Sequence, residues 1–420
     1  MRHFAELDPA RTAALFLHPP QPVDLAAQRD ELAVALGATL YCPATRQRLA
    51  GDLLRLARRG VRSAVACLED SVPDDLVGRA EDTLVRELAD LAGRPEWAGD
   101  PPLMLFLRAR TPEQLLSVVE RSGVGVDCLQ GFVLPKFGGT GQPDPRDWMA
   151  AVRRASDLAG RRLWAMPVLE SRDVAHLDTR REALFGVRAV LDEHRDLVLA
   201  VRTGATDLSA AYGLRRPRGA TVWDVRVVAD VLGDVINVLG RADGSGYPIT
   251  APVWEHFTSG ARVFRTTLSA GPFAGSGAEE LREQLIAEDL DGLVRELELD
   301  RVNGLQGKTV IHPSHVAVVH AVSVVTHEDF CDASDVLAQS AGGVMASSYR
   351  NKMNEAGPHR PWAERVLARA RAFGVARPEV SYAHLLQAQD EAWHAFAQPG
   401  DEPAAAGSGS GSGSGAAVGR

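Results

Sequence analysis

Lysine is almost absent from this chain of 420 residues: three of its 46 basic residues are lysine, and arginine supplies the rest. The formal net charge is −9, so the sequence does not support the basic surface that nucleic-acid binding requires. Cysteine is also scarce. The four cysteines form no CxxC pair, and two of them lie inside apolar runs, which favours a role as small buried hydrophobic residues.

Long apolar runs are missing too. No run reaches the length of a transmembrane helix, and the first 20 residues lack both the apolar core and the cleavage site of a signal peptide. Hydrophobic residues make up 45% of the chain and charged residues 24%, as in ordinary globular proteins. We therefore expect a cytoplasmic protein without a membrane partner, folded as one large domain or two small ones.

A repeating pattern of short apolar runs and amphipathic segments occupies most of the chain. Because each run is followed by a helical pattern, the runs predict buried parallel strands in βαβ units. Eight such units predict an α/β fold, a (β/α)8 TIM barrel with a C-terminal helical extension. A doubly wound sheet is the alternative, disfavoured because no GxGxxG turn follows an early strand. The runs are residues 38–44, 62–70, 103–110, 131–137, 163–169, 197–201, 247–255 and 307–313.

Four segments follow from this pattern. Residues 1–37 form an extension of helices and loops without chemistry of its own, and residues 38–340 form the barrel. Residues 341–397 form a helical extension expected to contact a neighbouring subunit. The Gly- and Ser-rich residues 398–420 predict a disordered tail. The run at 247–255 is the weakest strand because it contains two prolines.

Two carboxylates follow neighbouring runs. Glu170 comes directly after the run 163–169, and Asp207 lies in a glycine-containing turn after the run 197–201. Since ligands of barrels bind beyond the carboxyl ends of the strands, both side chains are expected in one mouth. Two carboxylates there suit Mg²⁺, which leaves its other positions to water and substrate. The alternative is that either acid caps the next helix.

Other charged residues end the earlier strands. The adjacent acids Glu69 and Asp70 end the second, and we expect one of them to serve the site and the other to cap or support it. Arg108 and Arg110 end the third strand on one face, where a guanidinium can clamp a substrate carboxylate; a salt bridge to surface helices is the alternative.

Two further residues complete the predicted mouth. Lys136, after the fourth strand, adds a second cation. His312, after the eighth, is expected to be a packed residue rather than a base. A metal held by two acids and faced by an arginine suits a substrate that chelates through a carboxylate and a neighbouring oxygen. Such a site stabilises an enolate in aldol or Claisen chemistry.

The motifs LYCPATR, LEDSV, LRAR, LPK, PVLES, GATDL, GLQGKTVIHPSHV and KMNEAGPH occur in this order. Together they resemble the citrate lyase beta-subunit-like proteins of the HpcH/HpaI aldolase superfamily, from about Ala38 to Val375. The similarity is greatest to a C–C bond lyase branch whose genes accompany tellurium-resistance and stress-response operons.

The resemblance implies a TIM barrel that binds Mg²⁺, and a homo-oligomer, for which we expect a trimer. It implies that one subunit lends a general acid/base, here Glu355, to its neighbour's site. The implied site residues are Glu170 and Asp207 for the metal, Arg108, Glu69, Asp70 and Glu355 for catalysis, and Arg108, Lys136, Gly204 and Thr206 for substrate binding.

The chain departs from the family pattern at two places. Glutamate replaces aspartate at position 355, and the opening R-S-x-L-F-x-P-G reads here as residues 37–44, without its arginine and final glycine. These departures leave the predicted metal site intact and weigh against recognition of a CoA thioester.

Our hypothesis is a Mg²⁺-dependent carbon–carbon lyase acting on an oxo or hydroxy acid or its acyl-CoA thioester. One alternative is a thioester hydrolase or malate-synthase-like condensing enzyme. The other is a metabolite-binding scaffold in a stress-response complex, and an open metal site argues against it because a scaffold does not need one.

Overall fold

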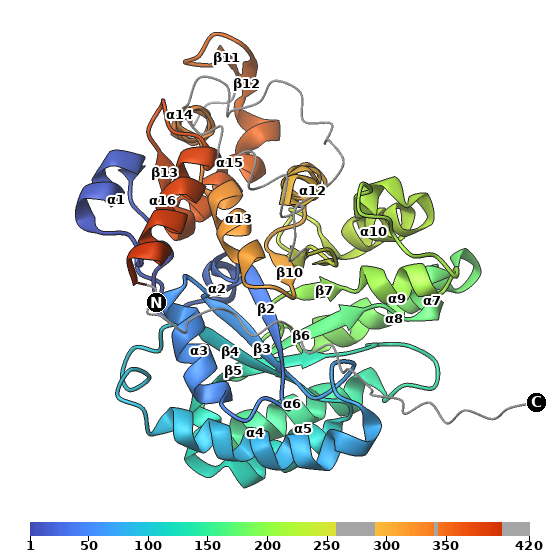
Figure 1. The fold of residues 1–420 in the computed structure, drawn as a ribbon. Coiled ribbons are helices and arrows are strands. Elements are labelled where there is room, and N and C mark those ends of the chain that lie inside the picture. Colours follow the sequence, from blue (N-terminus) through green and yellow to red (C-terminus); the bar gives the residue numbers. More distant parts are fainter. Residues whose placement is uncertain (258–289, 340–342, 397–420) are drawn as a thin grey trace, which may run out of the picture.

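Parallel strands form the central sheet of the computed structural model, which describes residues 1–257, 290–339 and 343–396 (Figure 1). Neighbouring strands pair in the order β8-β7-β6-β5-β4-β3-β2-β10-β9. The strands are β2 (Ala38–Pro43), β3 (Ser63–Cys67), β4 (Met104–Arg108), β5 (Leu129–Leu134), β6 (Trp164–Leu169), β7 (Val201–Thr203), β8 (Ile249–Thr250), β9 (Val253–Trp254) and β10 (Lys308–Val310).

The helices that follow these strands pack against the outer face of the sheet, and the inner face is covered by the barrel's own side chains, which is why most strands are apolar throughout. They are α3 (Leu49–Arg58), α4 (Val77–Ala92), α5 (Pro112–Ser122), α6 (Pro145–Ala159), α7 (Arg172–Ala175), α8 (Leu177–Glu193), α9 (Ala205–Ala210), α10 (Arg226–Leu239), α12 (Leu290–Val302) and α13 (Ser314–Ser323). Local sequence sets their starts. Thr111 caps α5 by accepting a hydrogen bond from the backbone N–H of Gln114, and Pro112 occupies the first turn.

Strands β8 and β9 are two halves of one strand position. β8 pairs with β7 on one side, and β9 pairs with β10 on the other. The backbone N–H of Gln306 also donates to the carbonyl of Ile249 at 2.9 Å, and β10 pairs with β2, so the ring is closed. The interruption falls at Pro252, which has no N–H to donate. The predicted (β/α)8 barrel is therefore confirmed, with its weakest strand divided at a proline.

The sixth strand begins later than the sequence predicts. The expected run was 197–201, whereas β7 starts at Val201. Before it, Val198 makes a single parallel bridge to Ala165 of β6. The shift moves the strand end to Thr203, directly before the glycine turn that contains Asp207.

Segments from the two ends of the chain pack side by side at one end of the molecule (Figure 1). β1 pairs antiparallel with β13, so the first 37 residues contain a strand as well as helices, and their Phe4 and Phe16 are buried. The elements are α1 (Pro9–Leu15), β1 (Phe16–His18), α2 (Arg29–Ala35), α14 (His327–Ala338), β11 (Val344–Ala346), β12 (Met353–Glu355), α15 (Ala356–Phe373), β13 (Val375–Ala376) and α16 (Tyr382–Phe396).

The predicted C-terminal extension is not purely helical, since β11 and β12 form a hairpin between α14 and α15. The tail 398–420, expected to be disordered, lies outside the described residues. None of the described helices is long and apolar enough to cross a membrane.

A buried ionic cluster ties α12 to the barrel. The ammonium of Lys308 on β10 lies 2.6 Å from carboxylate oxygens of both Glu296 and Asp300 on α12. Arg216 forms a further ion pair with Glu296. Burial raises the pKa of Asp300 to about 6; the positive charge of Lys308 opposes this rise, and the negative charge of Glu296 adds to it. Each member of the cluster is buried, so the loss of one cation leaves an uncompensated charge.

We predict that Lys308→Met lowers the free energy of unfolding by about 3–5 kcal/mol, because two buried acids lose their shared cation. Urea denaturation measures the change. The matched control is Lys352→Met: Lys352 also bridges two acids, Glu328 and Asp332, but its side chain is 40% exposed. We expect a smaller effect for it, because the pair with Glu328 is partly exposed and the buried Asp332 keeps a hydrogen bond from Asn354 at 2.8 Å. Equal effects of the two substitutions would contradict the prediction.

Candidate active site

Arg108, the last residue of β4, binds acids from two other strand ends. Its Nη2 lies 2.8 Å from Glu69, 3.2 Å from Asp70 and 3.1 Å from Glu170. The guanidinium, Glu69 and Glu170 are buried, whereas the Asp70 side chain is half exposed. Burial opposes the charge of Arg108, but these acids outweigh it and raise the pKa of the guanidinium further. The predicted convergence of the residues after β3, β4 and β6 is therefore present.

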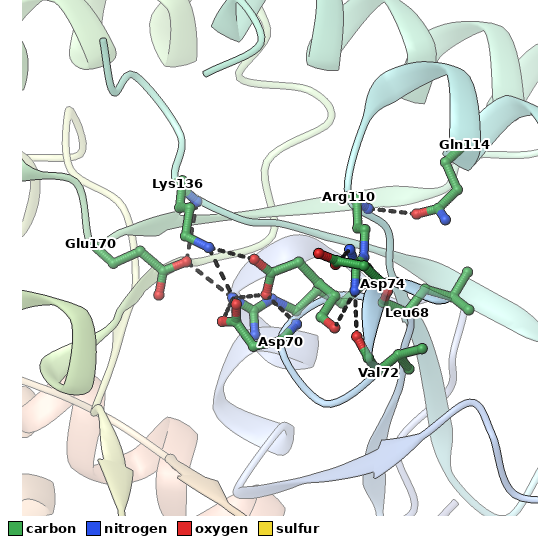
Figure 2. A network of polar contacts seen from close by, with 10 residues as sticks. Leu68, Asp70, Val72, Asp74, Arg110, Gln114, Lys136 and Glu170 are labelled. Carbon is green, nitrogen blue, oxygen red and sulfur yellow. Dashed lines mark hydrogen bonds and ion pairs between the residues drawn. The ribbon is translucent and has the colours of Figure 1, made fainter. Parts of the chain in front are cut away.

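Lys136, directly after β5, joins the same group through two atoms. Its Nζ donates to Glu69 at 2.6 Å and to Asp70 at 3.2 Å, and its backbone N–H donates to Glu170 at 3.1 Å. The backbone of Lys136 has φ +50°, a rare conformation for a residue with a side chain. Figure 2 shows the side chains of Lys136, Glu170 and Asp70 converging. This left-handed conformation directs the N–H of Lys136 to Glu170 and its ammonium to Glu69 and Asp70.

Gly204 provides the space that Glu170 occupies. A Cβ atom at position 204 would lie 2.6 Å from the Cβ of Glu170, closer than real Cβ atoms approach. Gly204 precedes α9, whose first turn contains Asp207, and Asp207 lies close enough to Glu170 for its charge to raise the pKa of the Glu170 carboxyl group. The two predicted metal-binding acids are therefore adjacent, and the glycine between β7 and α9 is a steric requirement of that arrangement.

The Glu170–Asp207 pair is electrostatically strained. Burial raises the pKa of Glu170 to about 7, and the charges of Asp207 and Glu69 add to this effect, while Arg108 opposes it. Burial and the nearby Asp70 also raise the pKa of Asp207. Two carboxyl groups in contact at neutral pH must share a proton or bind a cation. Their oxygens are the ligands that Mg²⁺ prefers, so this donor pair fits the predicted ion.

The described part of the chain contains no group of three or more His, Cys, Asp and Glu side chains arranged around one metal position. A closed site such as structural zinc requires four protein ligands. Mg²⁺ instead keeps several waters and takes one or two carboxylates. Within the described residues, the mouth therefore suits an open Mg²⁺ site better than a closed one.

Three residues considered from the sequence lie outside this group. Arg110 binds the loop after β3, donating to Leu68 O at 2.9 Å and to Val72 O, because the strand ends at Arg108 and its alternation stops there (Figure 2). Of the two arginines considered as binding a substrate carboxylate, only Arg108 belongs to this group of side chains. Thr206 is exposed and donates to Glu255, and His312 contacts Ser314 at 2.7 Å, as expected for a packed residue.

Glu355 lies on β12 of the hairpin, apart from the mouth. Its backbone N–H donates to His359 at 3.0 Å. Within the described residues, no hydrogen bond or ion pair joins Glu355 to Arg108, Glu170 or Asp207. A role of Glu355 in catalysis, in its own or a neighbouring subunit, stays a prediction.

Sequence reasoning missed the floor of the mouth. Tyr41 on β2 contacts two guanidinium groups, with its ring centroid 5.9 Å from Arg108 Cζ and 5.7 Å from Arg202 Cζ. Arg202 is buried on β7 and donates to Thr309 Oγ1 at 2.5 Å. The sequence does contain one signal for Arg202, which is a charged residue inside the apolar segment before GATDL. A charged side chain in such a segment either points into the barrel or is buried at a cost in free energy.

Comparison with protein families places residues 30–375 in a family described as C–C bond lyase of the TIM-barrel fold. The chain belongs to this family. The lyase assignment and the barrel predicted from the sequence agree with it. A comparison with curated proteins found no match.

The chain is similar to several solved structures. A citrate lyase from Burkholderia xenovorans LB400 is 16% identical, with a TM-score of 0.55 over 84% of this chain and 96% of that one. Protein CitE from Mycobacterium tuberculosis, in complex with magnesium, acetoacetate and coenzyme A, is 21% identical, with a TM-score of 0.49 over 80% and 99%. A Haloferax volcanii malate synthase magnesium/glyoxylate complex is 15% identical, with a TM-score of 0.44 over 67% and 73%.

We predict that Gly204→Ala removes Mg²⁺ binding while the fold survives, because the new methyl group displaces the Glu170 carboxylate. Isothermal titration with Mg²⁺ and circular dichroism measure the two properties. Gly78→Ala is the control: Gly78 lies in α4 and a Cβ there meets no atom within 4 Å. Unchanged Mg²⁺ affinity in Gly204→Ala would refute the steric role of the glycine.

Proposed function

We propose that the protein is a Mg²⁺-dependent carbon–carbon bond lyase that cleaves or forms a bond through an enolate of an oxo or hydroxy acid. The observation that carries the proposal is the close approach of Glu170 and Asp207 beside Arg108, where burial and the charge of Asp207 raise the pKa of Glu170. When bound, Mg²⁺ would polarise a carbonyl oxygen and stabilise the charge of the enolate.

The charges of the mouth support a substrate with a single negative charge. With one shared proton, the summed formal charge of the carboxylates and cations of the mouth is zero. Exchange of that proton for Mg²⁺ leaves one excess positive charge, which matches the carboxylate of a monoanionic oxo acid. The carboxylates are Glu69, Asp70, Glu170 and Asp207, and the cations are Arg108, Lys136 and Arg202.

Arg108 supports the same substrate class. Its guanidinium already contacts three carboxylates, so it is held in one orientation at the edge of the acid pair. A planar guanidinium is the side chain best suited to a carboxylate ligand. Lys136 lies on the other side of Glu69 and would fix Glu69 and Asp70 while the substrate binds.

Other parts of the hypothesis rest on the resemblance alone. They are the trimeric homo-oligomer, the use of Glu355 from a neighbouring subunit and the setting in tellurium-resistance operons. An acyl-CoA thioester is the second substrate class, and thioester condensation or hydrolysis at the same mouth is the alternative reaction. A scaffold without catalysis is the alternative of another class.

We predict that the wild type binds Mg²⁺ and then pyruvate in isothermal titration, whereas Glu170→Gln and Asp207→Asn bind neither, because each variant loses one of two metal ligands. Acetyl-CoA in place of pyruvate tests the thioester class. A wild type that binds no Mg²⁺ would refute the proposal in favour of the scaffold, and so would a variant that binds Mg²⁺ unchanged.

For the substrate contact, we predict that Arg108→Lys weakens pyruvate binding at least tenfold, because an ammonium cannot reproduce the planar fork of a guanidinium. The control is Arg110→Lys, which changes the neighbouring arginine that binds loop carbonyls. Its pyruvate affinity should stay within about threefold of the wild type. The same loss in both variants would refute a specific role for Arg108.

The raised pKa of Glu170, about 7, makes metal binding pH-dependent. Below pH 7, Mg²⁺ must displace a proton, so its affinity should fall about tenfold per pH unit. Without the ion, the folded chain holds a proton that the unfolded chain has lost, so stability falls as pH rises from about 4.5 to 7. We therefore predict a larger Mg²⁺-induced rise in Tm at pH 8 than at pH 6. A pH-independent rise would contradict this reading.

A further inference from the structure

Tyr41 is distinctive among the residues of β2. Its neighbours Leu40 and Cys42 are buried, whereas the tyrosine remains partly exposed. Its ring contacts two cations, Arg108 from β4 and Arg202 from β7. No hydrogen bond joins its hydroxyl to another described residue. The O–H group of this partly exposed side chain is therefore not held by another described residue.

Arg202 lies under the ring without an acid partner in the described chain. It is 1% exposed, and its Nη1 and Nη2 reach only the hydroxyls of Thr39 and Thr309, at 3.5 and 2.5 Å, and the sulfur of Met166 at 3.8 Å. Burying a guanidinium without a carboxylate costs several kcal/mol. An aromatic face offsets part of that cost. A negative charge developing on the ring's own oxygen would offset more of it.

The other proton carriers of the mouth are already engaged. Glu69 and Asp70 are ion-paired with Arg108 and Lys136. Glu170 and Asp207 form the pair proposed for the metal. Thr206 donates to Glu255, and Glu355 lies on the outer hairpin. Among the described residues of the mouth, Tyr41 is therefore the proton donor whose hydroxyl has no hydrogen-bond partner.

We propose that Tyr41 is a catalytic acid that protonates the enolate carbon, and that Arg202 is a positioning residue for its phenolate. This inference rests on the proposed lyase function and adds a residue to it.

The proton transfer balances within the site and the solvent. As the Tyr41 O–H bond breaks, the electron pair of the enolate forms the new C–H bond, and the negative charge passes to the phenolate oxygen. Arg108 and Arg202 then flank that charge until water returns a proton. Burial raises the pKa of Tyr41, and the two arginines oppose this rise, as a group that must ionise transiently requires.

The test is the exchange of pyruvate methyl protons in D2O with Mg²⁺, followed by ¹H NMR. Tyr41→Phe removes one oxygen and keeps the ring, so we expect exchange to slow at least 100-fold while Mg²⁺ and pyruvate affinities stay within threefold. Tyr349→Phe is the matched control, because its hydroxyl contacts His327 on the outer surface. It should exchange as the wild type does.

The outcomes separate this inference from the proposed function. Exchange by the wild type with a Tyr41→Phe rate within threefold would overturn the role of Tyr41 alone. Loss of exchange in Glu355→Gln, with Tyr41→Phe active, would overturn it in favour of the neighbouring subunit's acid. No Mg²⁺-dependent exchange by the wild type would overturn the proposed function and this inference together.

Arg202→Met supplies a readout that does not depend on turnover. Removal of a cation beside the ring should raise the pKa of Tyr41, measured from tyrosinate absorbance as the difference between parent and Tyr41→Phe chains. Because Arg202 has no acid partner in the described chain, the substitution leaves no unpaired carboxylate. An unchanged Tyr41 pKa would overturn the positioning role.

Discussion

The mouth of this barrel depends on one guanidinium. Arg108 contacts acids that follow β3 and β6, and so joins the ends of strands that are not neighbours. Without a cation at this point, the buried Glu69 and Glu170 would repel each other at low dielectric. With Arg108 present, Glu170 is held against Gly204 and Asp207. Arg108 thus offsets the repulsion between Glu69 and Glu170, whereas the repulsion between Glu170 and Asp207 remains for a ligand to offset.

The rare lysines follow a common rule. Lys136, Lys308 and Lys352 each bridge two carboxylates, at distances of 2.6–3.2 Å. A compact ammonium with three rotatable donors can lie between two acids. In a chain whose other basic residues are arginine, lysine occupies positions where two acids meet. The lysines therefore mark the points of concentrated negative charge in the mouth, in the barrel wall and in the C-terminal helices.

Most of the barrel and much of its mouth could be predicted from the sequence, because residues that end parallel strands are brought together by the fold whatever the details. Glu69, Arg108, Lys136 and Glu170 are of this kind. Arg110 could not be separated from Arg108, since the difference lies in where β4 ends. Arg202 and Tyr41 were missed because their meeting depends on which strands face each other across the barrel. The pairing of β1 with β13 was hidden for the same reason.

That pairing has a consequence for how the chain is made. Phe16 and its partner Ala376 are about 360 residues apart, and Val375 also bridges Val325. At about 5–20 residues per second, a ribosome needs on the order of 20–70 s to travel between them. The first strand therefore has to wait, unpaired, while the whole barrel emerges. Because β1 has only three residues, its unpaired edge offers little backbone for other strands to bind during synthesis. The contact of the fold that forms last is therefore one whose delay carries little risk of aggregation.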